Sequence, residues 1–235
     1  MNIIKNLIKL RNPEKSKILQ KFFKTGIGEY GEGDIFLGIK NPDLRKMAKE
    51  NLDLDFFEIQ KLISSKYHES RLLAVMILVY KFEKTKVLNY KKDIFNFYLK
   101  NIKYINNWDI VDLSCYKIIG NYIYNFDKEK INILYNFTSS KNIWERRISI
   151  ISLFYFIKNN SFSDSLKICE ILINDKEDLI NKACGWMLRE IGKRDIKILY
   201  DFLDKYANIM PRVELRYSIE RLKNEIRLKY LNKKC

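Results

Sequence analysis

Three tryptophans lie in stretches with a helical pattern, and each has a charged residue close by on the same helix face. Residues three or four apart share a face of an α-helix. An indole beside a charged group on a non-core face is an unusual arrangement for a large apolar side chain, so the pattern indicates a binding or catalytic surface. Core packing is the alternative for each tryptophan alone, and above all for Trp144. The three pairs are Trp108 with Asp112, Trp144 with Arg147, and Trp186 with Arg189.

Two other motifs are weaker. Gly26-Ile-Gly-Glu-Tyr-Gly31 has the glycine spacing of a dinucleotide-binding loop, but that pattern has meaning only between a strand and a helix. A helical stretch precedes it here, so we expect a flexible or specially turned connection instead. The single histidine, His68, lacks the partners that a metal or nucleophilic site needs, and we expect it to cap or pack near the start of a helix.

The cysteines predict no metal or redox site. Their spacings match no zinc or disulfide pattern, and we expect buried or incidental thiols in a reducing compartment. No cofactor and no metal are therefore expected. The four residues are Cys115, Cys169, Cys184 and Cys235.

Glycine and proline are too scarce for a protein rich in β-turns. The chain has eight Gly and three Pro in 235 residues, and five of the glycines fall between residues 26 and 38. Apolar residues in 71–81 and 148–157 cover most of a helix circumference, which is typical of buried helices. We therefore predict an all-α protein of about a dozen helical segments.

A weak internal repeat sets the expected architecture. His68, Trp108, Trp144 and Trp186 recur at intervals of 40, 36 and 42 residues, a period found in HEAT-like helical pairs. Such pairs stack into an α-solenoid with one concave face. We predict a single HEAT-like-repeat domain over residues 1–235, with an irregular helical bundle as the alternative.

The charge balance favours a polyanionic partner. Lys and Arg number 44 against 29 Asp and Glu, which gives a formal charge of +15, and both ends of the chain are basic. Nucleic acid is the usual reason for such an excess, although a solvated Lys-rich surface is the alternative. Apolar runs are too short for a bilayer and no export signal is recognisable. We expect a cytoplasmic monomer with no membrane contact.

The stretches that carry the tryptophans resemble the AlkD-like DNA alkylation repair family, which comprises HEAT-like-repeat DNA glycosylases that excise alkylated purines. The resemblance spans nearly the whole chain, and the order and spacing of its motifs are its specific part. Segment 25–34, rich in glycine and acidic residues, is found in only part of that family. The matching stretches are 36–45, 107–113, 142–147, 182–190 and 211–216.

The resemblance implies the site residues and their roles. The two cleft tryptophans of the family correspond to Trp108 and Trp186, its catalytic aspartate to Asp112, and its DNA-contacting arginine to Arg147. An early aromatic residue corresponds to Phe22 or Phe23. Arg189, on the face of Trp186, joins the residues expected to bind DNA.

The implied chemistry suits these residue types. A purine alkylated at N3 or N7 is cationic and leaves without a general acid, so one carboxylate can stabilise an oxocarbenium-like sugar. Indole faces attract cations, and an arginine can hold a phosphate without reading sequence. The expected partner is double-stranded DNA with alkylated bases. A non-catalytic HEAT-like DNA-binding protein and a protein–protein scaffold are the alternatives.

Overall fold

The computed structural model describes residues 3–232, and the regular secondary structure in that range is helical. It contains sixteen α-helices, α1 to α16, with two short 3₁₀ turns and one π-helical turn. No strand forms among the described residues; an isolated parallel bridge pairs Ile35 with Tyr67. The all-α prediction is confirmed. Cys235, one of the four cysteines, lies outside the described residues.

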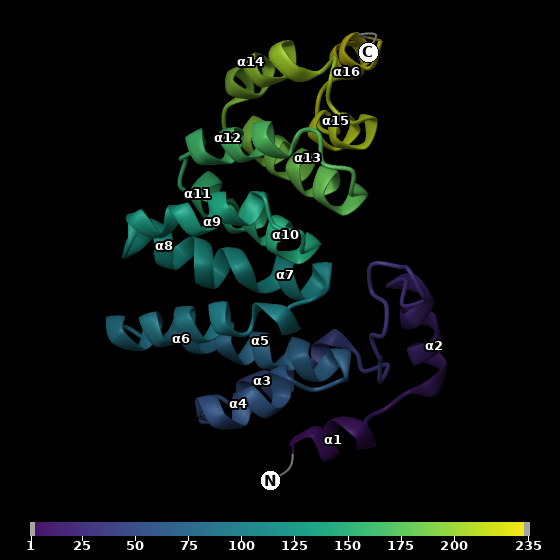
Figure 1. The fold of residues 1–235 in the computed structure, drawn as a ribbon, viewed down its shortest axis with the longest axis vertical. Helices are drawn as coiled ribbons and strands as arrows, with labels where there is room; N and C mark the ends of the chain where they lie inside the picture. The colour runs from purple at the N-terminus through teal and green to yellow at the C-terminus, as the bar shows by residue number, and fades with distance from the viewer. Residues whose placement is uncertain (1–2, 233–235) are drawn as a thin grey trace. The chain divides into compact units, whose positions relative to one another are not determined.

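The chain divides into two compact units, and the boundary falls between Ser114 and Cys115. Figure 1 shows α1 and α2 lying to one side of the other helices of the first unit. The helices of this unit are α1 (Ile3–Lys9), α2 (Pro13–Phe22), α3 (Asn41–Glu50), α4 (Phe56–Ile63), α5 (His68–Lys84), α6 (Leu88–Lys100), the 3₁₀ turn Ile102–Tyr104 and α7 (Trp108–Cys115).

Helix α5 is the centre of the first unit. It packs against α3, α4 and α6, and every residue from Leu72 to Val79 is buried. A helix with apolar residues all round must be covered on all sides, and the neighbouring helices supply that cover. The prediction of a buried helix over 71–81 is confirmed.

The second unit continues directly from α7 through a π-helical turn. Helix α13 is its centre and packs against α10, α12, α14 and α15. Its elements are the π-helical turn Tyr116–Gly120, α8 (Asn121–Asn125), the 3₁₀ turn Lys128–Lys130, α9 (Ile131–Thr138), α10 (Ile143–Ser152), α11 (Phe154–Lys158), α12 (Ser163–Leu172), α13 (Asp178–Gly192), α14 (Ile196–Tyr206), α15 (Arg212–Ser218) and α16 (Asn224–Leu231).

The helix expected over 148–157 is broken, and that prediction is wrong in this detail. Helix α10 ends at Ser152 and α11 begins at Phe154, with Leu153 between them. The Ser152 carbonyl lies so close to Gly120 that a Cβ built there would be 2.0 Å from its oxygen. Only glycine admits this approach. Sixteen α-helices occur where about a dozen segments were expected, and this break accounts for one of the additional helices.

Asparagine side chains begin two of the helices that carry tryptophans. Asn142 Oδ1 accepts a hydrogen bond from the Trp144 amide at 2.9 Å, and Asn107 Oδ1 accepts one from the Trp108 amide at 2.8 Å. Such caps satisfy amides that have no partner within the helix.

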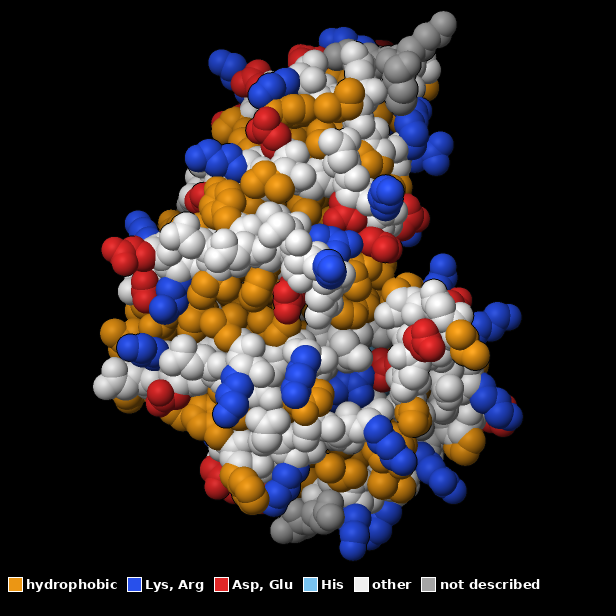
Figure 2. All heavy atoms as spheres, viewed as in Figure 1, with side chains coloured by type: hydrophobic (Ala, Val, Ile, Leu, Met, Phe, Trp, Pro, Cys, Tyr) orange, Lys and Arg blue, Asp and Glu red, His pale blue; other side chains and the backbone are white. Residues whose placement is uncertain are grey.

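Lysine and arginine side chains are distributed over both units on the face drawn in Figure 2, where they do not gather into one patch. No helix within residues 3–232 is long and apolar enough to cross a membrane. Because the chain divides into two compact units, three expectations stay predictions: the HEAT-like solenoid, its concave face and the single domain over residues 1–235.

Candidate functional site

Helix α7 carries the first predicted pair, Trp108 and Asp112. Trp108 is the first residue of this helix, and Asp112 follows one turn later on the same face. Both side chains are half-buried. A π-helical turn starts at Tyr116, one turn beyond Asp112. Such turns inside helices are frequent at functional sites, and nothing in the sequence pattern predicted this one.

Two aromatic side chains at the C-terminal end of α2, Phe22 and its capping residue Phe23, contact the Trp108 indole. The Phe23 ring stacks on it, with centroids 5.1 Å apart and planes inclined by 18°. Phe22 meets the indole with its edge at 6.1 Å. The indole Nε1 donates a hydrogen bond to Tyr30 Oη at 3.4 Å. One face of the indole is therefore covered by Phe23, while Phe22 itself is 62% exposed.

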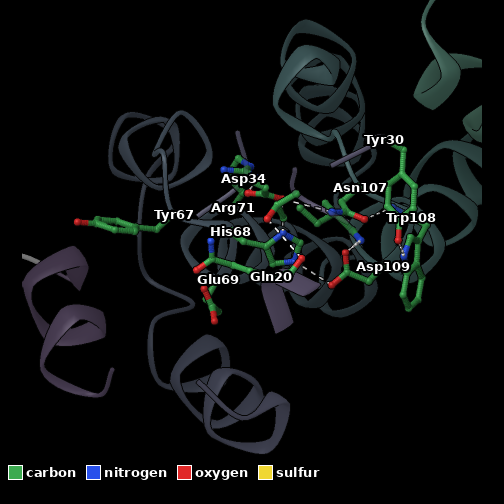
Figure 3. A network of polar contacts seen from close by, with 12 residues as sticks. Gln20, Tyr30, Asp34, Tyr67, His68, Glu69, Arg71, Asn107, Trp108 and Asp109 are labelled. Carbon is green, nitrogen blue, oxygen red and sulfur yellow. Dashed lines mark hydrogen bonds and ion pairs between the residues drawn. The ribbon is translucent and has the colours of Figure 1, made fainter. Parts of the chain in front are cut away.

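His68, the first residue of α5, lies between two carboxylates (Figure 3). Its Nδ1 is 2.8 Å from Asp34 Oδ2, and its Nε2 is 2.9 Å from Asp109 Oδ2. The imidazole is 1% exposed. Burial alone would lower the pKa of His68, but the Asp109 carboxylate and the hydrogen bonds to both aspartates raise it to about 9.

Asp34 is the most heavily bonded of these carboxylates. It is buried, and its Oδ1 accepts a hydrogen bond from Arg71 Nη2 at 2.5 Å. Its Oδ2 accepts a longer one, 3.3 Å, from Asn107 Nδ2. Burial alone would raise the pKa of Asp34, but His68 and Arg71 lower it to about 2. Asp34 is therefore ionised at neutral pH.

Glu69 holds the segment that follows Asp34 against the start of α5. Its Oε2 accepts from the Leu37 amide at 2.7 Å, and its Oε1 accepts from the Gly38 and Ile39 amides at 2.7 and 3.2 Å. These bonds satisfy both oxygens of a buried carboxylate. Residues 34–39 are thus tied to α5 by adjacent side chains, His68 and Glu69.

The glycine-rich segment was expected to be either a flexible or a specially turned connection, and the structure shows a turned one. Gly28 and Gly33 have φ values of 76° and 77°, which glycine adopts without strain. The Glu29 carboxylate accepts from the Gly26 amide at 2.8 Å, and that of Glu32 accepts from the Gly28 amide at 2.9 Å. Glu29 and Glu32 therefore bond the segment's own backbone.

A pocket of about 390 Å³ opens beside this network in the first unit. Phe23 and Phe36 form part of its apolar wall, His68 and Asp109 also line it, and Lys15 contributes a cation. No group of three or more potential metal-ligating side chains occurs among residues 3–232.

The other two tryptophans lie in the second unit and differ from each other. Trp144 is 6% exposed, which confirms the expectation that it is a core residue. Trp186 is half-buried on α13 and tilts against Phe154, with ring centroids 5.5 Å apart. Trp186 is thus the tryptophan of this unit that is accessible to a ligand.

The two arginines expected to bind DNA already have partners within the second unit. Arg147 is buried, and its Nη1 donates a hydrogen bond to the Leu179 carbonyl. Arg189 donates through Nη1 to the carboxylate of Glu220, which is half exposed. A phosphate would have to compete with these partners for either guanidinium.

Glu214 on α15 is the unusual acid of the second unit. It is fully buried, and neither carboxylate oxygen has a hydrogen-bond partner. Burial raises its pKa well above the ordinary value. The sequence analysis did not single out Glu214, because no local sequence pattern indicates that a glutamate at this position is buried.

The predicted site residues therefore fall in two groups. Phe22, Trp108 and Asp112 lie in the first unit, where Phe22 contacts Trp108 directly. Arg147, Trp186 and Arg189 lie in the second unit. Sequence reasoning missed the buried charge network around His68, since its aspartate partners are 34 and 41 residues away in the chain and no local spacing connects them.

The chain folds as an all-helical protein, and comparisons with known proteins identify the family to which it belongs. The model of the DNA alkylation repair enzyme family matches residues 3–222. The chain therefore belongs to the DNA alkylation repair enzyme family, as its sequence motifs predicted. No curated protein matches the chain.

Two solved structures are similar in fold. One is a protein of Enterococcus faecalis described as a predicted DNA alkylation repair enzyme, with a TM-score of 0.70 and 18% identity over 91% of this chain and 97% of its own. The other is smu.31 of Streptococcus mutans UA159, with a TM-score of 0.55 and 16% identity over 90% of this chain and 98% of its own. At such identities the likeness concerns the fold alone.

Proposed function

We propose that this protein is a DNA glycosylase, which hydrolyses the N-glycosidic bond of cationic N3- or N7-alkylated purines in duplex DNA. The family match over residues 3–222 supports repair of alkylation damage. The observation that carries the finer assignment is the pairing, on one face of α7, of a half-buried indole and a half-buried carboxylate. These are the side chains that such chemistry requires.

The reaction needs only one carboxylate. As the bond between C1′ and the purine nitrogen breaks, its electron pair moves into the cationic ring and the base leaves neutral. Positive charge develops on the sugar, where Asp112 stabilises it and orients the attacking water. Water adds to C1′ and releases one proton, which leaves an abasic sugar. No general acid is required, in contrast to ordinary glycoside hydrolysis.

The tryptophans hold the positive charge of the substrate. Since Phe23 covers one face of Trp108, the lesion would meet the opposite side of the indole. Trp186 would contribute in the same way from the second unit. A cation over an indole gains about 1–2 kcal/mol when water is excluded.

The excess of positive charge supplies affinity without sequence preference. A formal charge of +15 favours salt-dependent binding to phosphates through counterion release. Arg147 and Arg189 would hold phosphates near the lesion, and Arg189 would first have to leave Glu220. Double-stranded DNA is accordingly the proposed partner.

Base release from a duplex with a single 7-methylguanine tests the proposal under single-turnover conditions. Asp112→Asn should bind the duplex and release base at least ~10²-fold more slowly than wild type, because the developing charge loses its counter-charge. Asp53→Asn is the matched control, since Asp53 is an exposed carboxylate before α4. It should release base at the wild-type rate.

Two results would contradict the assignment. If Asp112→Asn releases base as fast as wild type, Asp112 has no catalytic role. If wild type binds the duplex but releases no base, the protein is a non-catalytic DNA-binding member of its family.

A further inference from the structure

The contacts of His68 determine its protonation state. A hydrogen bond needs one donor and one acceptor, and an ionised carboxylate can only accept. Both ring nitrogens lie within 3 Å of a carboxylate oxygen, 2.8 Å for Asp34 and 2.9 Å for Asp109. Asp34 also accepts from Arg71 at 2.5 Å, as an ionised group would. The imidazole must therefore donate from both nitrogens, which makes it a buried cation.

One of these contacts leads directly to the candidate site. Asp109 is the residue after Trp108 and belongs to the first turn of α7. Its Oδ2 binds His68, while its Oδ1 accepts from the Ile110 amide at 2.9 Å. The imidazolium therefore restrains the backbone turn from which the indole extends.

A second route to the same indole runs through stacked rings. The His68 ring stacks on Phe36, with centroids 4.2 Å apart and planes inclined by 22°. Phe36 stacks on Phe23 at 4.8 Å and 23°. Phe23 in turn stacks on Trp108 at 5.1 Å and 18°. The His68 ring also meets Phe23 directly, with centroids 5.4 Å apart and planes inclined by 40°. The four rings therefore form one connected set, which we name the aromatic stack and which links His68 to Trp108.

We propose that His68, protonated on both ring nitrogens, is a positioning residue that fixes the orientation of the Trp108 indole. It acts on the indole by two routes. One is its contact with Asp109 in the first turn of α7, and the other is the aromatic stack. The inference rests on the proposed function, because that proposal assigns Trp108 to the lesion. Nothing in it requires His68 to touch DNA.

The surrounding charges favour this state. Asp34 and Asp109 face the imidazole, and Arg71 neutralises the second oxygen of Asp34. The Glu69 carboxylate beside it is occupied by backbone amides. Two lysines, Lys15 and Lys40, line the pocket that also reaches His68 and Asp109.

A pH titration followed by NMR tests the coupling in the intact chain, prepared without a histidine tag. His68 is the single histidine of the sequence, so one imidazole spin system reports its protonation. The three tryptophans give three indole N–H signals, and Trp108→Phe identifies the one from Trp108. We expect an imidazolium at neutral pH and a displacement of the Trp108 signal at the pH where the imidazole titrates.

Two controls make the result specific. The titration is repeated in Tyr30→Phe, because the Tyr30 phenol accepts the Trp108 hydrogen bond and would otherwise be a second influence on that signal. The Trp186 signal, from the second unit, should not respond at the imidazole midpoint. In Asp109→Asn the midpoint should fall by about 1–3 pH units, since an opposite charge is lost, and the Trp108 displacement should fall with it.

The inference is overturned if the imidazole carries a single proton at neutral pH, or if the Trp108 signal stays constant through the imidazole titration. Retained dispersion of the Trp108 signal shows that the first unit of Asp109→Asn is folded, while the Trp186 signal reports on the second unit. None of these measurements uses DNA. Failure of base release by wild type would therefore refute the proposed function, while the NMR titration would still decide the role of His68.

Discussion

Replacement of His68 by glutamine should remove a large pH dependence from the stability of the protein. The pKa of His68 rises from 6.5 to about 9 on folding. At 1.36 kcal/mol per pH unit, this rise corresponds to about 3 kcal/mol. Since the side chain is 1% exposed, solvent screening removes little of it. A contribution of this size is a substantial part of the 5–15 kcal/mol that stabilises a typical domain.

The sign follows from the direction of the shift. A group whose pKa is higher in the folded state stabilises the fold fully below its unfolded pKa, and this stabilisation is lost as the pH rises through the folded pKa. The contribution of His68 is thus complete below pH 6.5 and disappears above about pH 9. Glutamine can donate to one carboxylate but cannot carry the charge.

Urea denaturation of wild type and His68→Gln at a series of pH values from 6 to 10 measures the effect. The difference in the free energy of unfolding between the two proteins should be largest at pH 6 and should shrink by about 3 kcal/mol toward pH 10. Titrating groups that do not contact His68 are common to both proteins and cancel in the difference. Parallel profiles over the whole range would refute the assignment of a buried imidazolium.

Three further changes have defined outcomes. Gly120→Ala should lower the melting temperature in calorimetry, because its Cβ would clash with the Ser152 carbonyl at a cost of about 1–3 kcal/mol. Glu220→Gln should release Arg189 and increase the slope of the logarithm of the duplex-binding constant against the logarithm of salt concentration by about one unit. An unchanged slope would exclude Arg189 from the phosphate contacts. Wild type should lose stability as the pH rises above 4.5, because Glu214 has a raised pKa in the folded state. In urea titrations, the free energy of unfolding of wild type relative to Glu214→Gln should therefore be lower at pH 8 than at pH 5, because the loss due to His68 is common to both proteins and cancels.

The helical nature of this chain could be predicted because its signals are local. Scarce glycine and proline, together with apolar residues at helical spacing, specify helices wherever they occur. The run 72–79 is buried on all sides as its composition required. The break after Ser152 could not be predicted in this way, because it depends on Gly120, which is 32 residues earlier and contacts the Ser152 carbonyl.

The candidate site shows the same division between local and distant signals. Trp108 and Asp112 could be paired from their spacing of four, which holds on any helix. The position of the Trp108 indole could not be predicted, because it depends on Phe23, Phe36 and Tyr30 from a segment more than seventy residues away. No periodicity connects residues that far apart, and their contact is a product of tertiary packing.

The glycine-rich segment illustrates how an accurate local argument can miss a role. Its acidic residues are a sound reason to reject a pyrophosphate site, and the turned backbone agrees with that. Asp34 at its end, however, is ionised only because His68 and Arg71 lie within hydrogen-bonding distance. Two of its charged neighbours come from the first turn of α5, so that the segment and this helix stabilise each other. His68, which has no informative neighbours in the sequence, is thus the cation that pairs with two distant aspartates. One of these aspartates, Asp109, follows Trp108 directly in the chain, and this pairing therefore helps to position the indole of the candidate site.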